Sequence, residues 1–152
     1  MAGGLVAVVA GGGIAGLASA VALRQAGWAV TVLEQAPEFG EAGAALGVTG
    51  NGMAALAALG LAEAVRAAGH LAPHAGFQDP AGRWLLRIPG NGARPGGVTT
   101  VCGIHRGRLH AVLRQAARSA GAELVTGAEV TAIRPGTAGG EAATVAWRAA
   151  AG

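Results

Sequence analysis

The sequence predicts an α/β protein built on a Rossmann-like βαβ fold, with a β-rich insertion later in the chain. A short Val-rich run at residues 5–10 is typical of a strand buried on both faces. Three glycines in G-x-G-x-x-G spacing follow it, then a helical pattern that ends at Gly27, then a second Val-rich run at residues 29–33. We expect these two strands to be parallel neighbours, with residues 5–9 at the centre of the sheet.

Each glycine of the motif has a separate physical role. Gly11 allows a sharp turn out of the first strand, and Gly13 lets a pyrophosphate approach the backbone. Gly16 lets the helix pack closely on the sheet. The N–H groups of the first helical turn, which contains Ala15, point towards the phosphates, and the helix dipole favours their negative charge. The motif therefore predicts a dinucleotide site.

An acidic residue stands where the ribose of such a dinucleotide would lie. Glu34 ends the second predicted strand, about 20 residues after the last glycine, and its carboxylate can accept both ribose hydroxyls. Its charge would repel a 2′-phosphate, so NADP is not expected here. We place the adjacent Gln35 in the same site. A glycine-rich turn that binds nothing is the plain alternative, because the motif alone is weak in a chain with 28 glycines.

The composition excludes several classes of protein. The chain has 152 residues, of which 52% are hydrophobic and 12% charged, so we expect one core-rich domain over residues 1–152. The net charge of +3 comes from scattered arginines with few aromatic residues, and nucleic-acid binding therefore has no support. Uncharged runs at residues 1–23 and 42–62 are broken by glycines, so neither is expected to span a membrane.

The sequence context of the cysteine and the spacing of the histidines predict that these residues have structural roles. Cys102 lies in an apolar, strand-like run and is expected to be a buried thiol, which fits a cytoplasmic location. A single cysteine can form neither an internal disulfide nor a Cys-based zinc site. The four histidines match no common metal-ligand spacing, so no metal is predicted.

After Glu34 the chain does not continue a simple βαβ series. We expect a loop at residues 35–46 and then two short helices, the first capped by Asn51 and ended by Gly60, the second at residues 61–68. Strand and turn signals between residues 70 and 95 predict the β-rich insertion. The later predicted elements are strands at 76–78, 83–88 and 98–104, a helix at 107–120 with Leu109, Val112, Leu113 and Ala116 on its apolar face, a strand at 123–126, and a hairpin of residues 130–134 and 142–147.

Arg106 stands at the start of the predicted helix at residues 107–120. A cation at a helix N-terminus opposes the helix dipole, and a nearby anion would relieve this. A cofactor phosphate or ribityl region is one candidate for that anion, and Glu38 or Glu41 is the other. The residues alone leave both open.

The sequence resembles the N-terminal part of FAD-dependent aromatic monooxygenases, the para-hydroxybenzoate and salicylate hydroxylase kind. The resemblance runs from about residue 5 to the C-terminus and rests on the order and spacing of several motifs. The matching residues are the run 8–17, Ala20, Leu23, Gly27, Val32, Glu34, the Ala-Pro-Glu-Phe run at 36–39, Asn51, Leu56, Leu59, Gly60, Leu61, Asp79, Gly82, Arg83, Arg106, Leu109 and Leu113.

This resemblance implies that the glycine turn holds the pyrophosphate of FAD, that Glu34 holds its ribose, and that Arg106 lies against the cofactor. It implies that NAD(P)H reduces the flavin and that O₂ then hydroxylates a small aromatic or polyketide-like substrate. The family's later segments are not found before Gly152. We therefore expect an N-terminal fragment with a missing C-terminal half, which does not turn over alone.

Two alternative functions stay open. NAD-dependent dehydrogenases and reductases carry the same glycine motif and acid, although they usually continue with βαβ units after Glu34. The second alternative is a truncated, non-catalytic chain that binds a nucleotide weakly or not at all.

Overall fold

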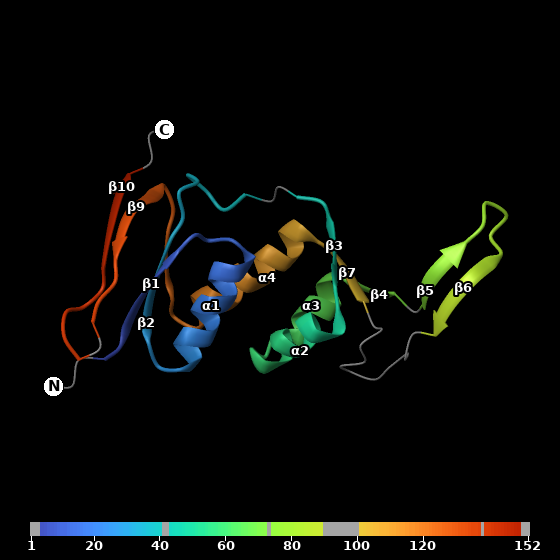
Figure 1. Ribbon diagram of the computed structural model, residues 1–152, viewed down its shortest axis with the longest axis horizontal. Helices are drawn as coiled ribbons and strands as arrows, with labels where there is room; N and C mark the ends of the chain where they lie inside the picture. The colour runs from blue at the N-terminus through green and yellow to red at the C-terminus, as the bar shows by residue number, and fades with distance from the viewer. Residues whose placement is uncertain (1–3, 41–42, 73, 90–100, 138, 150–152) are drawn as a thin grey trace. The chain divides into compact units, whose positions relative to one another are not determined.

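The computed structural model forms two compact units, Met1–Glu41 with Leu113–Gly152, and Ala42–Val112. The division falls within helix α4 (Arg106–Ser119), so the glycine turn and Glu34 belong to the first unit and Arg106 to the second. The elements are shown in Figure 1. The structure describes residues 4–40, 43–72, 74–89, 101–137 and 139–149.

A parallel sheet carries the first unit. Strands β1 (Val6–Ala10), β2 (Ala29–Leu33) and β8 (Glu123–Val125) pair in the order β1-β2-β8, and both pairings are parallel. Helix α1 (Ile14–Gln25) connects the first two strands. The predicted βαβ unit is therefore confirmed, and β8, the strand expected at residues 123–126, extends its sheet.

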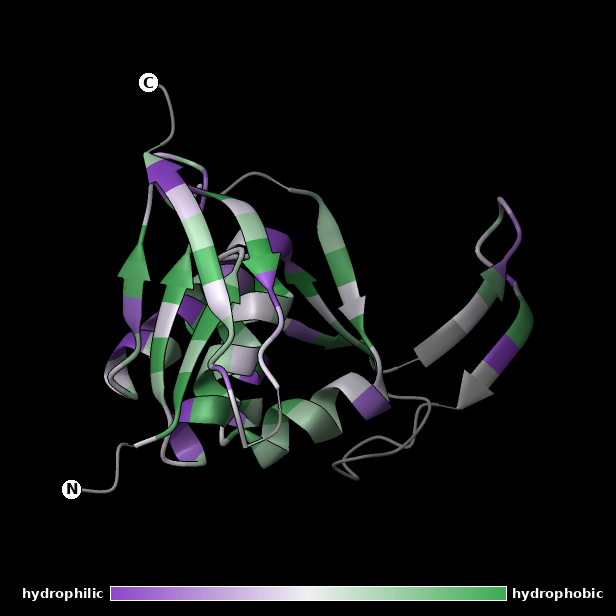
Figure 2. Cartoon of the chain, turned by 60° about the vertical axis from the view of Figure 1, so that its left-hand side comes forward, coloured by the Kyte–Doolittle hydropathy of each residue, from purple (hydrophilic) through white to green (hydrophobic). Residues whose placement is uncertain are grey.

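The place of β1 in this sheet differs from the prediction. Among the described residues β2 is the central strand and β1 lies at an edge, so the prediction of a central β1 is wrong. Val6 is 68% exposed and Val8 43%, so β1 is not buried on both faces, although Figure 2 shows it as hydrophobic. A valine-rich run reports strand propensity, whereas burial depends on which segments pack beside the strand.

Helix α1 packs its apolar side on the sheet. Leu17, Ala20 and Val21 are buried and follow helical i, i+3, i+4 spacing. At the end of the helix the guanidinium of Arg24 donates to two carbonyl oxygens, that of Trp28 at 2.6 Å and that of Ala120 at 2.8 Å. Arg24 therefore joins the end of α1 to the residue that follows α4.

An antiparallel hairpin of β9 (Ala128–Arg134) and β10 (Thr144–Ala149) completes the first unit. The predicted hairpin is confirmed, and β9 begins two residues earlier than expected. This earlier start matters for the site, because it brings Ala128 into the strand.

The second unit contains an antiparallel sheet with the order β3-β7-β4 and two helices. Strand β3 overlaps the predicted loop at residues 35–46, and β4 was not among the predicted strands, because segments as short as Ala-Leu-Gly-Val and His-Leu-Ala carry a weak strand signal. Pairing with β7 overrides that weak preference. The elements are β3 (Ala45–Val48), α2 (Gly50–Ala58), α3 (Ala62–Ala68), β4 (His70–Ala72) and β7 (Val101–His105).

Details of the second unit correct some predictions and confirm others. The N-cap position of helix α2 is Thr49 and not Asn51, which lies inside the helix, so the predicted cap is wrong by two positions. The Thr49 hydroxyl donates to Oδ1 of Asn51 and makes no side-chain cap bond. Gly60 follows the helix with φ +74°, as its predicted role requires. Cys102 is fully buried, with Sγ 3.9 Å from the carbonyl oxygen of Val65, as expected.

The β-rich insertion is confirmed. Strands β5 (His74–Gln78) and β6 (Trp84–Pro89) pair as an antiparallel hairpin. The carboxylate of Asp79 accepts the backbone N–H groups of Ala81 and Arg83, each at 2.9 Å, and the side chain of Arg83 at 2.8 Å. These bonds from Arg83 hold the pKa of Asp79 below its usual value.

Two further predictions concern α4 and the strand before it. Helix α4 buries Leu109, Leu113 and Ala117, whereas Val112 and Ala116 are half-buried, so its apolar face is rotated slightly from the predicted one. The strand predicted at residues 98–104 is β7, and residues 98–100 lie outside the described residues.

Within the described ranges no helix has the length and apolar character needed to cross a membrane.

Candidate functional site

The glycine turn between β1 and α1 is shaped to receive an anion. Gly11 has φ +99°, which an L side chain rarely adopts, and its N–H donates to the carbonyl oxygen of Leu33 at 2.7 Å. Gly13 is the N-cap of α1, and a Cβ built on it would meet nothing within 4 Å. The turn is therefore closed towards β2 and open at Gly13.

The first turn of α1 supplies donors at this open position. The first intrahelical bond runs from the N–H of Leu17 to the carbonyl oxygen of Gly13 at 2.9 Å. The N–H groups of Ile14, Ala15 and Gly16 consequently have no acceptor within the helix. The first turn holds no acidic residue and the cap has no side chain, so nothing in the turn competes with a bound anion for these groups.

Gly16 sets the distance between helix and strand. A Cβ at this position would lie 1.9 Å from the carbonyl oxygen of Gly11 and 3.2 Å from Cγ1 of Val9. Real Cβ contacts are never this short, so only glycine allows the observed approach. This is the role predicted for the third glycine of the motif.

Glu34 joins the end of β2 to the glycine turn. Its Oε2 accepts the N–H of Gly12 at 2.7 Å, and its Oε1 accepts the N–H of Ala36 at 2.8 Å. A carboxylate offers about four lone-pair positions, so two remain for other donors. Glu34 can therefore hold the turn in shape and still accept hydroxyl groups of a ligand.

The turn between β8 and β9 fixes the backbone around Glu34. The N–H of Glu34 donates to the carbonyl oxygen of Val125, and the N–H of Ala128 donates to that of Glu34, both at 2.8 Å. Gly127, with φ +64°, donates to the carbonyl oxygen of Ala36 at 2.8 Å. These three bonds place the start of β9 beside the acid.

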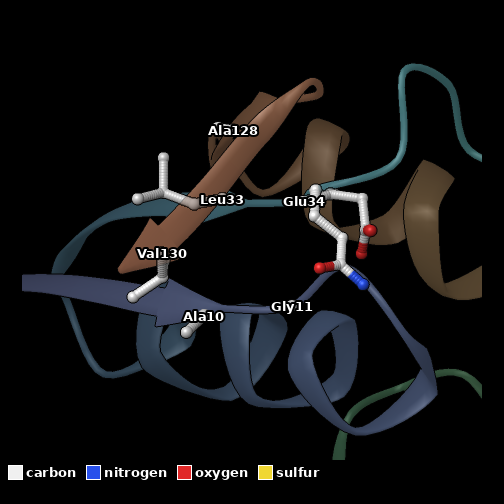
Figure 3. Close-up of a pocket in the computed structure, with 7 residues that line it drawn as sticks. Ala10, Gly11, Leu33, Glu34, Ala128 and Val130 are labelled. Atoms are coloured by element: carbon white, nitrogen blue, oxygen red, sulfur yellow. The ribbon is translucent and has the colours of Figure 1, made fainter. Parts of the chain in front are cut away.

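A pocket of about 270 Å³ lies between these elements. Figure 3 shows Glu34 and Gly11 at one end, and Ala10 and Val130 together at the other. Small apolar side chains line most of the wall, and the Glu34 carboxylate is the charged group in it. The lining residues are Ala10, Gly11, Leu33, Glu34, Gln35, Ala128 and Val130.

Most of the residues proposed from the sequence come together in the first unit. Gly11, Glu34 and Gln35 line the pocket, and Gly13, Ala15 and Gly16 form the turn and helix start beside it. Sequence reasoning missed Ala128 and Val130. Placing the predicted strand at residues 123–126 beside β2 could have found them, because parallel strands bring their carboxyl ends, and the chain that follows, to one edge.

Arg106 belongs to the second unit. Its N–H donates to the carbonyl oxygen of Ala44 at 3.0 Å, and a Cβ built on Gly43 would lie 2.8 Å from Cβ and Cδ of Arg106. Gly43 has φ +150°, so both backbone conformation and close packing favour glycine there. Glu41, one of the anions considered for Arg106, lies outside the described residues.

In the described parts of the chain no cluster of three His, Cys, Asp or Glu residues could hold a metal ion.

The strand, glycine turn, helix and terminal acid define a dinucleotide-binding protein of the α/β class. Residues 5–150 match the FAD binding domain family, and the chain belongs to that family. The match supports FAD over the alternative of an NAD-dependent dehydrogenase.

Curated relatives of the chain include hydroxybenzoate hydroxylases and FAD-dependent monooxygenases. The chain is 40% identical over 131 residues to a probable 2-heptyl-3-hydroxy-4(1H)-quinolone synthase of Rhodococcus erythropolis, covering 85% of this chain and 33% of that protein. It is 40% identical over 116 residues to the 3-hydroxybenzoate 6-hydroxylase of Polaromonas naphthalenivorans, covering 75% and 29%. The chain thus spans about a third of the length of the curated relatives it matches.

Solved structures show the same fold. The tetrameric form of 2-methyl-3-hydroxypyridine-5-carboxylic acid oxygenase superposes with a TM-score of 0.76 at 29% identity, over 94% of this chain and 38% of that one. The resemblance to FAD-dependent monooxygenases expected from the motifs is therefore confirmed.

Proposed function

We propose that the first unit binds the ADP half of FAD. The pyrophosphate lies on the turn from Gly11 to Gly13 and on the free N–H groups at the start of α1, including those of Ala15 and Gly16. The observation that carries this proposal is the open position at Gly13 in front of donors that the helix leaves unpaired.

The ribose and adenine follow from the same geometry. The two remaining acceptor positions of Glu34 bind the ribose hydroxyls, beside Gln35. The apolar pocket lined by Ala10, Ala128 and Val130 takes the flat adenine ring. A carboxylate already holding two backbone N–H groups is fixed in place, which lowers the entropic cost of binding.

We place Arg106 in the same proposal as a second cofactor contact, on the resemblance described above. Its position at the start of α4 and its close packing against Gly43 support a defined side-chain position. Bound FAD would accept electrons from NAD(P)H and, with O₂, oxygenate a substrate. The chain's own residues bind and orient that cofactor.

We further propose that residues 1–152 form one FAD-binding domain, the N-terminal portion of a cytoplasmic monooxygenase acting on a small aromatic substrate. The names of these relatives give a 3-hydroxy-quinolone as a product, and a hydroxybenzoate and a hydroxypyridine carboxylic acid as substrates. Each of these compounds is an aromatic ring that carries a hydroxyl group. The remaining two thirds of such a protein would supply the substrate pocket.

Glu34→Ala is expected to weaken binding of ADP by about 1.5–3 kcal/mol, the scale of hydrogen bonds to a charged group. Calorimetry with ADP and with 2′-deoxy-ADP separates the ribose contact from the effect on the turn. Wild type should prefer ADP, and the variant should bind both ligands equally. Glu38→Ala, an exposed acid in the same loop, is the control. An unchanged preference for ADP in Glu34→Ala would place the ribose elsewhere.

The 152-residue chain is expected to bind FAD without hydroxylating a substrate. A reactive flavin needs walls on both faces to exclude water, and the described residues build an ADP site. The assay compares NAD(P)H consumption with hydroxylated product across a panel of phenols, with FAD added. We expect at most slow, wasteful oxidation of NAD(P)H. One product per NAD(P)H would overturn the proposal that a substrate portion is missing, and no FAD binding would favour the non-catalytic alternative.

A further inference from the structure

We propose that Phe39 is a positioning residue for the pyrophosphate turn and that Arg114 holds it there; the inference rests on the function proposed above. It begins with Gly12, the middle residue of the glycine turn. The G-x-G-x-x-G pattern leaves this position open to other residues. The backbone of Gly12 also lies outside the left-handed region that favours glycine. Neither the glycine motif nor the backbone conformation therefore explains why residue 12 is a glycine.

The side chain of Phe39 explains it. A Cβ built on Gly12 would lie 2.5 Å from Cε1 of Phe39 and 3.1 Å from Cβ of Glu34. The half-buried ring of Phe39, in the loop after β2, therefore occupies the space that any side chain at position 12 would need. Glycine at position 12 is required by its neighbours and not by the backbone.

Arg114 covers the same ring from helix α4. Its guanidinium carbon lies 5.7 Å from the centroid of the Phe39 ring, within the range of a cation–π contact. Gly12 is thus held from two sides. Glu34 accepts its N–H at 2.7 Å, and Phe39 packs where its Cβ would stand.

The next residue, Gly13, is the open position at which the pyrophosphate would lie. Anion affinity depends on how well the N–H groups are fixed before the ligand arrives. Loss of the Phe39 ring frees one side of Gly12 and lets the turn move, although no ligand contact is removed. Phe39 therefore acts on affinity through the turn.

The first test is a double-mutant cycle between Gly12 and Phe39, measured by calorimetry with ADP. Gly12→Ala and Phe39→Ala are each expected to weaken binding about tenfold, within the range of coupled neighbours. In the double variant the clash with the Phe39 ring is gone and only the contacts of 3.1 and 3.2 Å with Glu34 remain, so the loss should stay well below the product of the two single effects. A hundredfold loss, the product of the two single effects, would refute the contact.

The second test asks whether Arg114 acts through Phe39. Arg114→Gln is expected to weaken ADP binding about twofold to fivefold, the scale of one exposed cation–π contact. In the Phe39→Ala background the same change should have no further effect. An equal loss in both backgrounds would mean that Arg114 acts independently, and would contradict this part of the proposal.

A control separates positioning from general stability. Leu113→Val removes buried volume next to Arg114 on α4 and should lower the melting temperature without changing ADP affinity. If Leu113→Val weakens ADP binding as much as Phe39→Ala, the role of Phe39 is merely structural and the inference fails. It also fails if Phe39→Ala binds ADP like wild type. If wild type itself binds neither ADP nor FAD, the proposed function is what fails.

Discussion

Gly13→Val is expected to abolish detectable FAD binding while the protein still folds. The Cβ of residue 13 points into open space, so valine meets no protein atom there within 4 Å of its Cβ. The branched side chain instead fills the place proposed for the pyrophosphate. Loss of two charge-assisted hydrogen bonds, each worth about 1.5–3 kcal/mol, lowers affinity by more than about 100-fold.

Calorimetry with FAD measures this loss, and thermal unfolding shows that the fold is kept. Valine is a poor N-cap residue, which costs about 1 kcal/mol of helix stability. Gly4→Val is a matched control, because its Cβ also meets nothing within 4 Å and lies outside the turn. Equal FAD affinity in Gly13→Val and wild type would show that the pyrophosphate site is wrongly assigned.

Gly16→Ala is expected to destabilise the fold by about 3 kcal/mol, at the upper end of typical overpacking effects. The added methyl group would lie 1.9 Å from the carbonyl oxygen of Gly11. That oxygen is backbone and cannot easily turn aside, since it shares a peptide plane with the N–H of Gly12, which donates to Oε2 of Glu34 at 2.7 Å. Helix α1 must therefore move away from β1.

Urea or guanidinium unfolding measures this change, and Gly13→Ala provides the control. The same methyl group three residues earlier meets no neighbour within 4 Å. Inside a helix, replacing glycine with alanine normally stabilises by roughly 0.5–1 kcal/mol. The expected destabilisation by Gly16→Ala is thus opposite to the usual effect of replacing glycine with alanine in a helix. A Gly16→Ala variant more stable than wild type would contradict the close approach of helix and strand.

Local patterns were enough to predict the βαβ unit and its glycine turn. The Val-rich runs, the glycine spacing and the acid at the end of β2 each reflect a constraint within a few residues. The hairpin turn at Asp79 is similarly local, because its carboxylate accepts the N–H groups of Ala81 and Arg83, two and four residues later. These features needed no knowledge of distant contacts.

Other features depend on contacts between distant segments. Strand β3 is poor in strand-forming residues and exists because β7 pairs with it. The edge position of β1 is set by which strands pair, and valine content does not encode that choice. Phe39 reads as a loop anchor in the sequence, and its contact with Gly12 becomes visible once the loop is folded back.

The backbone bonds from the β8–β9 turn to Glu34 and Ala36 have a consequence for biosynthesis. Glu34 is translated long before Val125 and Ala128, the residues that fix its backbone. During synthesis the glycine turn cannot reach its folded conformation until these residues have been added to the chain, since domains fold as units. Cofactor loading should therefore begin only after β9 has left the exit tunnel, however early the glycine motif emerges.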